Sequence, residues 1–494
     1  MKRVAWTKFQ DFYLRLGFLK ALAAVLSVER RSVPNDGIIH RLQSPLFDPA
    51  PKHPMLWTKV EQFFPEVQSI KNRAALNKKE KEKEQQSPSV AEALLVRGDC
   101  PSTLFAITGP TSYKVLDWGR NVELIGRGNQ ITERGLLLRF LLHERETSAF
   151  FSGDVSGWNP FSLNLKEKLF FLYHLAEIDG VIVELLLRLG DPDRDGPTEL
   201  ESADAARLTC AALLDVLKRE QHKVPPAEVL RFRIASALAA TIAEELDMLD
   251  EVHDLMGATR RKLPKIIKPR ARRAKALGGG RRSRKTTKNA DHQTIPRFEQ
   301  LVDLGFLSKP LVESDDEIER IAARKRWVYS PTDVCLRWAA AVRELQRGDS
   351  PFLWHSFAAA ALRAFQIQPS VSVHANRANL TARYVWQAYE HIHRRVGANP
   401  LDSVALFAML SAAVDGIPLE MSEIHNFMLT IRQKSLLPQH AFFSSGNELD
   451  QMFIQLKPGF LEQVESLPGE QAVFRFAGVA DENSRLAPIN KARP

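Results

Sequence analysis

The chain has 494 residues, too many for one ordinary hydrophobic core, so about two to four domains are expected. Hydrophobic residues make up 44% and charged residues 26%, the balance of a globular soluble protein, and no apolar run is long enough to predict a membrane helix. Cys100, Cys210 and Cys335 stand alone, which argues against a zinc ribbon, a redox motif and an oxidising compartment. We therefore expect a cytoplasmic protein.

The net charge of +9 is unevenly distributed. Residues 260–288 contain 14 lysines and arginines and no acidic residue, so the rest of the chain carries a net charge of −5. Two prolines and the glycine run 278–280 argue against a continuous helix there. A flexible cationic segment neutralises phosphates without a fixed geometry, which favours a nucleic acid as its ligand. The alternative is a solvated linker.

The chain begins with an expected helical region over residues 1–76, followed by a charged linker over 77–89. The first residues have the length of a signal peptide, but Asp11, Arg15 and Lys20 interrupt the apolar run. The pattern instead predicts an amphipathic helix.

Residues 90–145 predict a first small module. The expected order is a helix that ends at Gly119, a strand over 122–125, a turn over 126–129 and a second helix capped by Thr132.

A helical domain is expected over residues 158–255, with Ser162 as the cap of its first helix. Asp191, Asp193, Asp195 and Gly196 match the start of a calcium loop. Ser202 stands where the closing glutamate belongs, so a polar loop between helices is favoured. The basic flexible segment, residues 256–290, follows.

Residues 291–345 predict a second module with the same order of elements. A helix over 295–309 is followed by a short strand, a polar hairpin, a strand that ends at Tyr329 and a capped last helix. A helical region over 350–398 and a weaker third copy over 399–480 complete the chain.

The sequence segments that predict these modules resemble the winged-helix superfamily, in which a recognition helix, a β-hairpin wing and a last helix follow one another. The matching words are "VLDWGRNVELI" with "QITERG", "LVDLGFL" with "VYSPTD", and "NPLDSVALFAMLSAAVDGIPLEMSEIHNFMLTIRQ" with "NELDQMFIQLKPGFLEQV". The second copy departs from the pattern because Cys335 and its neighbours stand where a glycine is usual, and the first has almost no wing. The resemblance implies a mainly α fold with small β-hairpins, built from winged-helix modules joined by helical regions.

The resemblance and the charge pattern together predict the DNA-contacting residues, because basic side chains on a helix, a wing or a flexible segment contact phosphates. In the basic segment they are Arg260, Arg261, Lys262, Lys265, Lys268, Arg270, Arg272, Arg273, Arg281, Arg282, Arg284 and Lys285; in the modules they are Lys114, Arg120, Arg127, Arg297, Arg324, Lys325 and Arg326. Winged helices also mediate protein contacts, and the first recognition helix is not basic, so that alternative stays open.

No local motif indicates catalysis. The chain lacks a phosphate-binding P-loop, a zinc-protease H-E-x-x-H word and a nucleophile elbow. We expect no cofactor and no metal, although carboxylates far apart in sequence can still assemble a metal-dependent nuclease.

The favoured function is a non-enzymatic DNA-binding component of a bacterial multi-protein assembly, and the helical word that follows the first wing resembles proteins of anti-phage defence clusters. The alternatives are a partner subunit similar to the kleisin-type proteins of chromosome-organising ATPases, and the dispersed-carboxylate nuclease. The expected partners are DNA, bound through its backbone, and one or more protein subunits, with no membrane. In the acidic third module, Phe453, Leu456 and Phe460 either receive a protein partner or close the module's own core.

Overall fold

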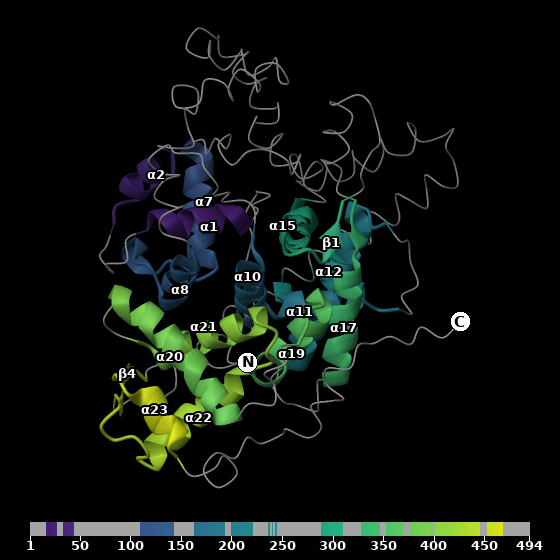
Figure 1. Cartoon of the computed structure of the whole chain (residues 1–494). Coiled ribbons are helices and arrows are strands. Elements are labelled where there is room, and N and C mark those ends of the chain that lie inside the picture. The colour runs from purple at the N-terminus through teal and green to yellow at the C-terminus, as the bar shows by residue number, and fades with distance from the viewer. Residues whose placement is uncertain are drawn as a thin grey trace, which may run out of the picture. The chain divides into compact units, whose positions relative to one another are not determined.

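The computed structural model describes residues 16–26, 33–43, 109–142, 163–192, 199–220, 288–309, 328–345, 352–369, 376–396, 399–444 and 452–467, with isolated positions between 236 and 244. This part of the chain is mainly helical and contains two short antiparallel hairpins, which confirms the expected mainly α fold with small β-hairpins (Figure 1). Within it, no helix combines the length and the apolar character that crossing a bilayer requires.

The described residues divide into two compact units. The first unit holds the middle module, which consists of α11 (Gly180–Leu189), α12 (Ser202–Glu220), α15 (Lys288–Leu304), β1 (Leu307–Ser308), β2 (Ser330–Pro331) and α17 (Asp333–Leu345). The second unit holds two further modules and the helices that join them. Its N-terminal module consists of α1 (Leu16–Val25), α2 (Asn35–Gln43), α7 (Gly109–Asn121), the short helix η2 (Arg127–Asn129) and α8 (Glu133–Leu141).

The C-terminal module of the second unit is formed by α20 (Arg377–Val396), α21 (Leu401–Val414), α22 (Met421–Gln433), β3 (Ala441–Phe443), β4 (Ile454–Leu456) and α23 (Phe460–Glu465). It is preceded by α18 (Phe352–His355) and α19 (Phe357–Phe365). One further helix, α10 (Leu165–Ile178), begins in the second unit and continues into the first.

The middle module closes its strands into a small three-part sheet. Leu200, just before α12, exchanges backbone hydrogen bonds with Tyr329 at 2.8 and 3.0 Å. The strand that follows Tyr329 pairs with β1, so that Leu307 faces Pro331. The module includes α11, α12 and the bridge at Leu200 between them, so it begins well upstream of residue 291, where the sequence pattern placed its start.

The C-terminal module repeats this topology. Pro400, just before α21, bridges Phe453, and β4 pairs with β3 so that Phe442 faces Gln455. The sheet order is again first strand, last strand, middle strand, with β3 at one edge. This copy, the weakest in the sequence, has the longest paired hairpin in the described chain.

The N-terminal module has the same order in a minimal form. Val33, just before α2, donates its N–H to the carbonyl of Gly128 at 3.1 Å, and Ile125 bridges Ile131. The expected strand over 122–125 is therefore reduced to one bridge. Gly128 and Asn129 both have a positive φ, and this lets the chain reverse within a few residues.

The third helix of each module ends in the same turn. Glu123, Gly305 and Ser435 have left-handed backbones with φ of 58°, 86° and 47°. The next residue in each case donates its N–H to a carbonyl five residues earlier, at 2.9, 2.9 and 3.1 Å, as in a Schellman motif. This turn sets the direction in which the chain leaves the helix for the hairpin.

The prediction that Gly119 ends the first of these helices was wrong, because α7 continues to Asn121. A side chain at Gly119 would meet Leu22 at 2.5 Å. The glycine therefore allows α1 to approach α7, and Glu123 supplies the left-handed turn.

A threonine begins the last helix of two modules. Thr132 caps α8, as predicted, because its hydroxyl oxygen accepts the N–H of Gly135 at 3.1 Å, and it also donates to the carbonyl of Glu123 at 2.6 Å. Thr332 similarly donates to the carbonyl of Gly305 at 2.7 Å. Each threonine thus joins the last helix to the turn that ends the third helix.

The helix expected to be amphipathic at the N-terminus is buried all round over its described part, α1. Even Lys20 is buried, and its ammonium group lies 2.9 Å from the Glu167 carboxylate. Glu167 also exchanges hydrogen bonds with Asn164 across the start of α10, so Asn164 caps that helix. The expected cap, Ser162, lies outside the described residues.

The N-terminal and C-terminal modules pack on each other within the second unit. Arg134 on α8 forms an ion pair with Asp402 on α21 at 3.0 Å, and the Phe140 carbonyl oxygen lies 2.8 Å from Nε2 of His391 on α20. Lys166 on α10 places its ammonium group 4.1 Å from the ring centroid of Phe407. The first two contacts join the N-terminal module to the C-terminal module, and the third joins α10 to the C-terminal module.

Candidate nucleic-acid interface

Most of the predicted DNA-contacting residues lie outside the described residues. These are all twelve basic residues chosen between 260 and 285, and the wing residues Arg324, Lys325 and Arg326. Their roles stay predictions. The backbones of Lys114 and Arg127 are described, on α7 and η2, but their side chains are not.

The prediction that Arg297 contacts DNA was wrong. Its side chain is completely buried, and its guanidinium group lies 2.7 Å from the carboxylate of Asp179, which caps α11. An arginine in this position joins the third helix of the middle module to the first. It has no surface left for a phosphate.

Arg120 is also committed to structure. Its guanidinium group donates to Asp117 at 2.6 Å, to Asn35 at 2.8 Å and to the side-chain oxygen of Asn129. Because Asn129 also donates to the Val33 carbonyl at 2.7 Å, this network joins α7 to the hairpin turn and to the chain before α2. The side chain of Arg120 remains partly exposed, so only part of its charge faces solvent.

The winged-helix resemblance predicts that the third helix of a module reads the major groove, so the exposure of this helix is compared among the three modules. In the middle module every residue of α15 from Thr294 to Leu301 is buried, including the polar Gln300. In the N-terminal module the exposed positions of α7 include the acidic Asp117. Over the positions whose side chains are described, 115–121 and 294–304, neither helix presents a basic or amide-rich face.

The third helix of the C-terminal module is different. Asn426 and Gln433 on α22 are exposed, Thr430 lies half-buried between them, and the exposed Lys434 follows directly. These positions fall on one side of the helix because they are spaced by about one or two turns. When the helices are aligned at their left-handed residues, Thr430 corresponds to the fully buried Gln300.

The acidic residue on the same side of α22 is already paired. The carboxylate of Glu423 accepts hydrogen bonds from Arg377 at 2.7 Å and from the backbone N–H of Glu420 at 3.0 Å. The helix face of Asn426 and Gln433 therefore combines amide groups with a lysine and a neutralised carboxylate. Neutralisation matters because an unpaired carboxylate would repel phosphate.

Two buried groups hold α22 in place. The Glu420 carboxylate accepts the backbone N–H groups of Ala358 and Ala359 at 3.0 and 2.8 Å, at the N-terminus of α19. Burial raises the pKa of Glu420 to about 7, against the opposing effect of these hydrogen bonds. On the next turn His425 is buried with its ring 4.6 Å from that of Trp354, and burial lowers its pKa to about 4, so that it is neutral at physiological pH.

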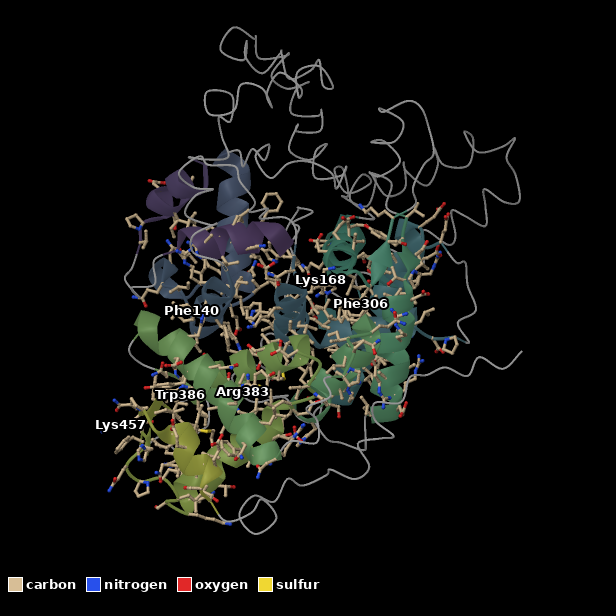
Figure 2. The ribbon with its side chains drawn as sticks, in the orientation of Figure 1. Phe140, Lys168, Phe306, Arg383, Trp386 and Lys457 are labelled. Atoms are coloured by element: carbon tan, nitrogen blue, oxygen red, sulfur yellow. The ribbon has the colours of Figure 1, made fainter. Side chains whose placement is uncertain are left out.

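The hairpin of this module exposes two aromatic rings. Phe442 on β3 and Phe453 beside β4 are each 39% exposed, which is unusual for phenylalanine. Lys457 follows β4 at the periphery of the module, with its ammonium group 4.7 Å from the centroid of the Phe442 ring (Figure 2). The other predicted apolar positions, Leu456 and Phe460, are buried and belong to the module's own core.

Sequence reasoning missed this surface. The amides of α22 lie in a segment whose sequence is that of an ordinary amphipathic helix. The sequence also does not distinguish an exposed phenylalanine from a buried one. The alternation over 452–457 predicts which residues share a face of the strand, but only the exposed fractions of Phe442 and Phe453 in the folded module show that this face stays open.

The described residues contain no group of three or more His, Cys, Asp or Glu side chains arranged to hold a metal ion. In comparisons with known proteins, the chain matches no family model, no curated protein and no solved structure.

Proposed function

We propose that the chain is a non-enzymatic DNA-binding subunit of a larger assembly, and that its C-terminal module presents α22 to the major groove. The observation that supports this most directly is the open side of α22, where Asn426, Gln433 and Lys434 are exposed and Thr430 is half-buried, beside a neutralised Glu423. In the middle module the equivalent helix is buried from Thr294 to Leu301, and in the N-terminal module Trp118, which corresponds to Thr430, is buried.

The residue types on α22 suit the groove chemically. Asparagine and glutamine pair with the edge of adenine through two hydrogen bonds, and lysine contacts guanine or phosphate. An α-helix fits the major groove of B-DNA. The same topology of helices and hairpin in all three modules supports the winged-helix resemblance, in which this helix is the one that reads DNA.

The basic segment supplies a second, sequence-independent contribution. Its 14 positive charges, held between α12 and α15 along the chain, suit non-specific attraction to phosphates. In this proposal the segment concentrates the protein on DNA and α22 selects among sites. The first contribution depends steeply on salt, and the second depends on sequence.

The protein partner stays a prediction from the sequence. Leu214 on α12 and Leu336 on α17 are 46% and 44% exposed in the middle module. Single exposed leucines are common on protein surfaces and do not by themselves indicate an interface.

The test separates the two DNA contributions. Duplex binding by the full chain is measured across a salt series by fluorescence anisotropy, with a variant lacking residues 260–288 and with the variant Asn426→Ala/Gln433→Ala. If half of the 14 charges engage phosphates, the deletion should reduce the salt slope by about 6.

The α22 variant should leave that slope nearly unchanged and should reduce discrimination among sequences selected from a random duplex library by roughly 5- to 100-fold for each lost pair. Gln387→Ala is the matched control, because Gln387 is an exposed amide on α20 of the same module. Equal effects of the control and the α22 variant would contradict the assignment of α22. Absence of duplex binding by the full chain would contradict the whole proposal.

A further inference from the structure

The β3–β4 hairpin of the C-terminal module carries a surface that duplex binding by α22 does not use. Phe442 faces Gln455 across the hairpin, and the Ser444 N–H donates to the Phe453 carbonyl at 2.9 Å. Opposed residues, and residues two apart along a strand, point to the same side of a hairpin. Phe442 and Phe453 therefore share one face as diagonal neighbours.

Exposure follows the same alternation. Phe453, Gln455 and Lys457 are exposed, whereas Ile454 and Leu456 are buried. The open face thus consists of His440, Phe442, Ser444, Phe453, Gln455 and Lys457. Within these described residues the face carries a lysine and a histidine and no carboxylate.

We propose that this face is a binding site for unpaired nucleotides, with one base stacked on Phe442 and another on Phe453 while Lys457 contacts the phosphate between or beside them. Aromatic rings on an open β-surface, next to a cation, are the chemistry that binds single strands without strong sequence preference. The proposal extends the proposed function, because it would direct the protein to a junction between duplex and single strand.

The small size of the apolar area favours bases over a protein partner. Two phenyl rings form its whole apolar content in the described hairpin, whereas a stable protein interface buries roughly 800 Å² on each partner. Two stacked bases need only two rings and a neutralised phosphate. The Lys457 ammonium group lies over the Phe442 ring, so a base that stacks on that face displaces it, and the flexible lysine stem lets the charge move to the neighbouring phosphate.

The test uses the full chain and a fluorescent oligothymidylate of about 15 nucleotides, which is long enough for one site. Phe442→Ala and Phe453→Ala should each weaken binding by roughly 5- to 100-fold, because one stacked base is lost in each case. The paired variant Phe442→Trp/Phe453→Trp keeps two stacking surfaces and should retain affinity. Leu336→Ala removes a similarly exposed apolar side chain from another module and is the matched control.

An abasic strand of the same length separates stacking from charge. The wild-type protein should prefer the strand with bases, and the double alanine variant should lose that preference. The double alanine variant should melt at a lower temperature, because each ring is 39% exposed and the rest of it is buried, so circular dichroism must show that the variant is folded at the temperature of the binding assay. Undiminished oligothymidylate binding by the double variant, or equal wild-type affinity for the abasic strand, would overturn the proposal.

The outcome is independent of the test of α22. Duplex discrimination that depends on Asn426 and Gln433, with no effect of the phenylalanines on single strands, would support the proposed function and reject this site. Stacking that depends on the phenylalanines, without duplex binding, would support this site and reject the proposed function.

Discussion

Arg297 and Asp179 form a fully buried ion pair, 2.7 Å between nitrogen and oxygen, that joins the third helix of the middle module to the start of its first helix. Asp179 also accepts the backbone N–H of Val181 at 3.2 Å, so one carboxylate caps α11 and neutralises the guanidinium group of Arg297 on α15. The residue that the sequence presented as a DNA contact is therefore a structural connection within the module.

Removal of one partner of this pair should strongly destabilise the first unit. Arg297→Met leaves the Asp179 charge buried without compensation and should cost about 3–5 kcal/mol of unfolding free energy. Chemical denaturation followed by tryptophan fluorescence measures the loss. The double variant Arg297→Met/Asp179→Asn retains a cap for α11 and should recover part of it. An exposed ion pair contributes roughly 1 kcal/mol or less. A loss of unfolding free energy in that range would show that the pair is not buried in solution.

The two threonines that start the last helices should behave alike. Thr132→Ala removes the cap of α8 and the bond to the Glu123 carbonyl, and Thr332→Ala removes the bond to the Gly305 carbonyl. Each should cost about 1–2 kcal/mol, because a partly buried carbonyl loses its donor and a helix end loses support. Hydrogen exchange should show faster exchange at the start of α8 or α17 only, which distinguishes a local effect from global unfolding. Thr132→Ser keeps the hydroxyl and serves as the control.

The shared left-handed turn predicts opposite effects of two substitutions. Ser435→Gly should stabilise the end of α22 by about 1 kcal/mol, because glycine adopts a positive φ without a Cβ penalty. Gly305→Ala should destabilise the end of α15 by a similar amount or more. Calorimetry of the two variants checks the prediction. It would be contradicted if both substitutions shifted the melting temperature in the same direction.

His425 should make the second unit sensitive to acid. Its pKa of about 4 in the folded protein lies below its ordinary value of 6.5, so between these values the unfolded chain binds a proton that the folded protein does not. Stability is therefore lost as the pH falls from 6.5 to 4, by up to about 3 kcal/mol. His425→Phe retains a ring against Trp354 and cannot titrate, so its stability should fall less steeply over that range. Parallel curves for the two proteins would show that His425 is already charged or exposed in the folded state.

The chain should turn over neither nucleic acid nor ATP. Purified protein is incubated with supercoiled plasmid and Mg²⁺ or Mn²⁺, and separately with ATP, and nicking and phosphate release are measured. No product is expected above the background of a mock purification. Cleavage that disappears when a carboxylate cluster such as 244–254 is neutralised would favour the dispersed-carboxylate nuclease instead.

Local chemistry in the sequence determined much of each module by itself. Thr132 before an apolar helix, Gly305 after one, and the alternation around Ile454 are short-range signals, and the structure has the cap, the left-handed turn and the strand at those positions. These signals work because a cap, a positive φ or a two-residue period depends on only a few neighbouring residues.

Tertiary structure alone decided which surfaces are open. The side chain of Arg297 looks like a DNA contact until Asp179, 118 residues earlier, is placed beside it. Lys20 looks solvated until Glu167 pairs with it. Gln300 and Thr430 occupy equivalent helix positions, yet Gln300 is fully buried and Thr430 only half-buried. Phe442 and Phe460 are the same residue type, one in solvent and one in the core. Whether a side chain is buried depends on the residues that pack against it, and those residues are usually distant in the sequence.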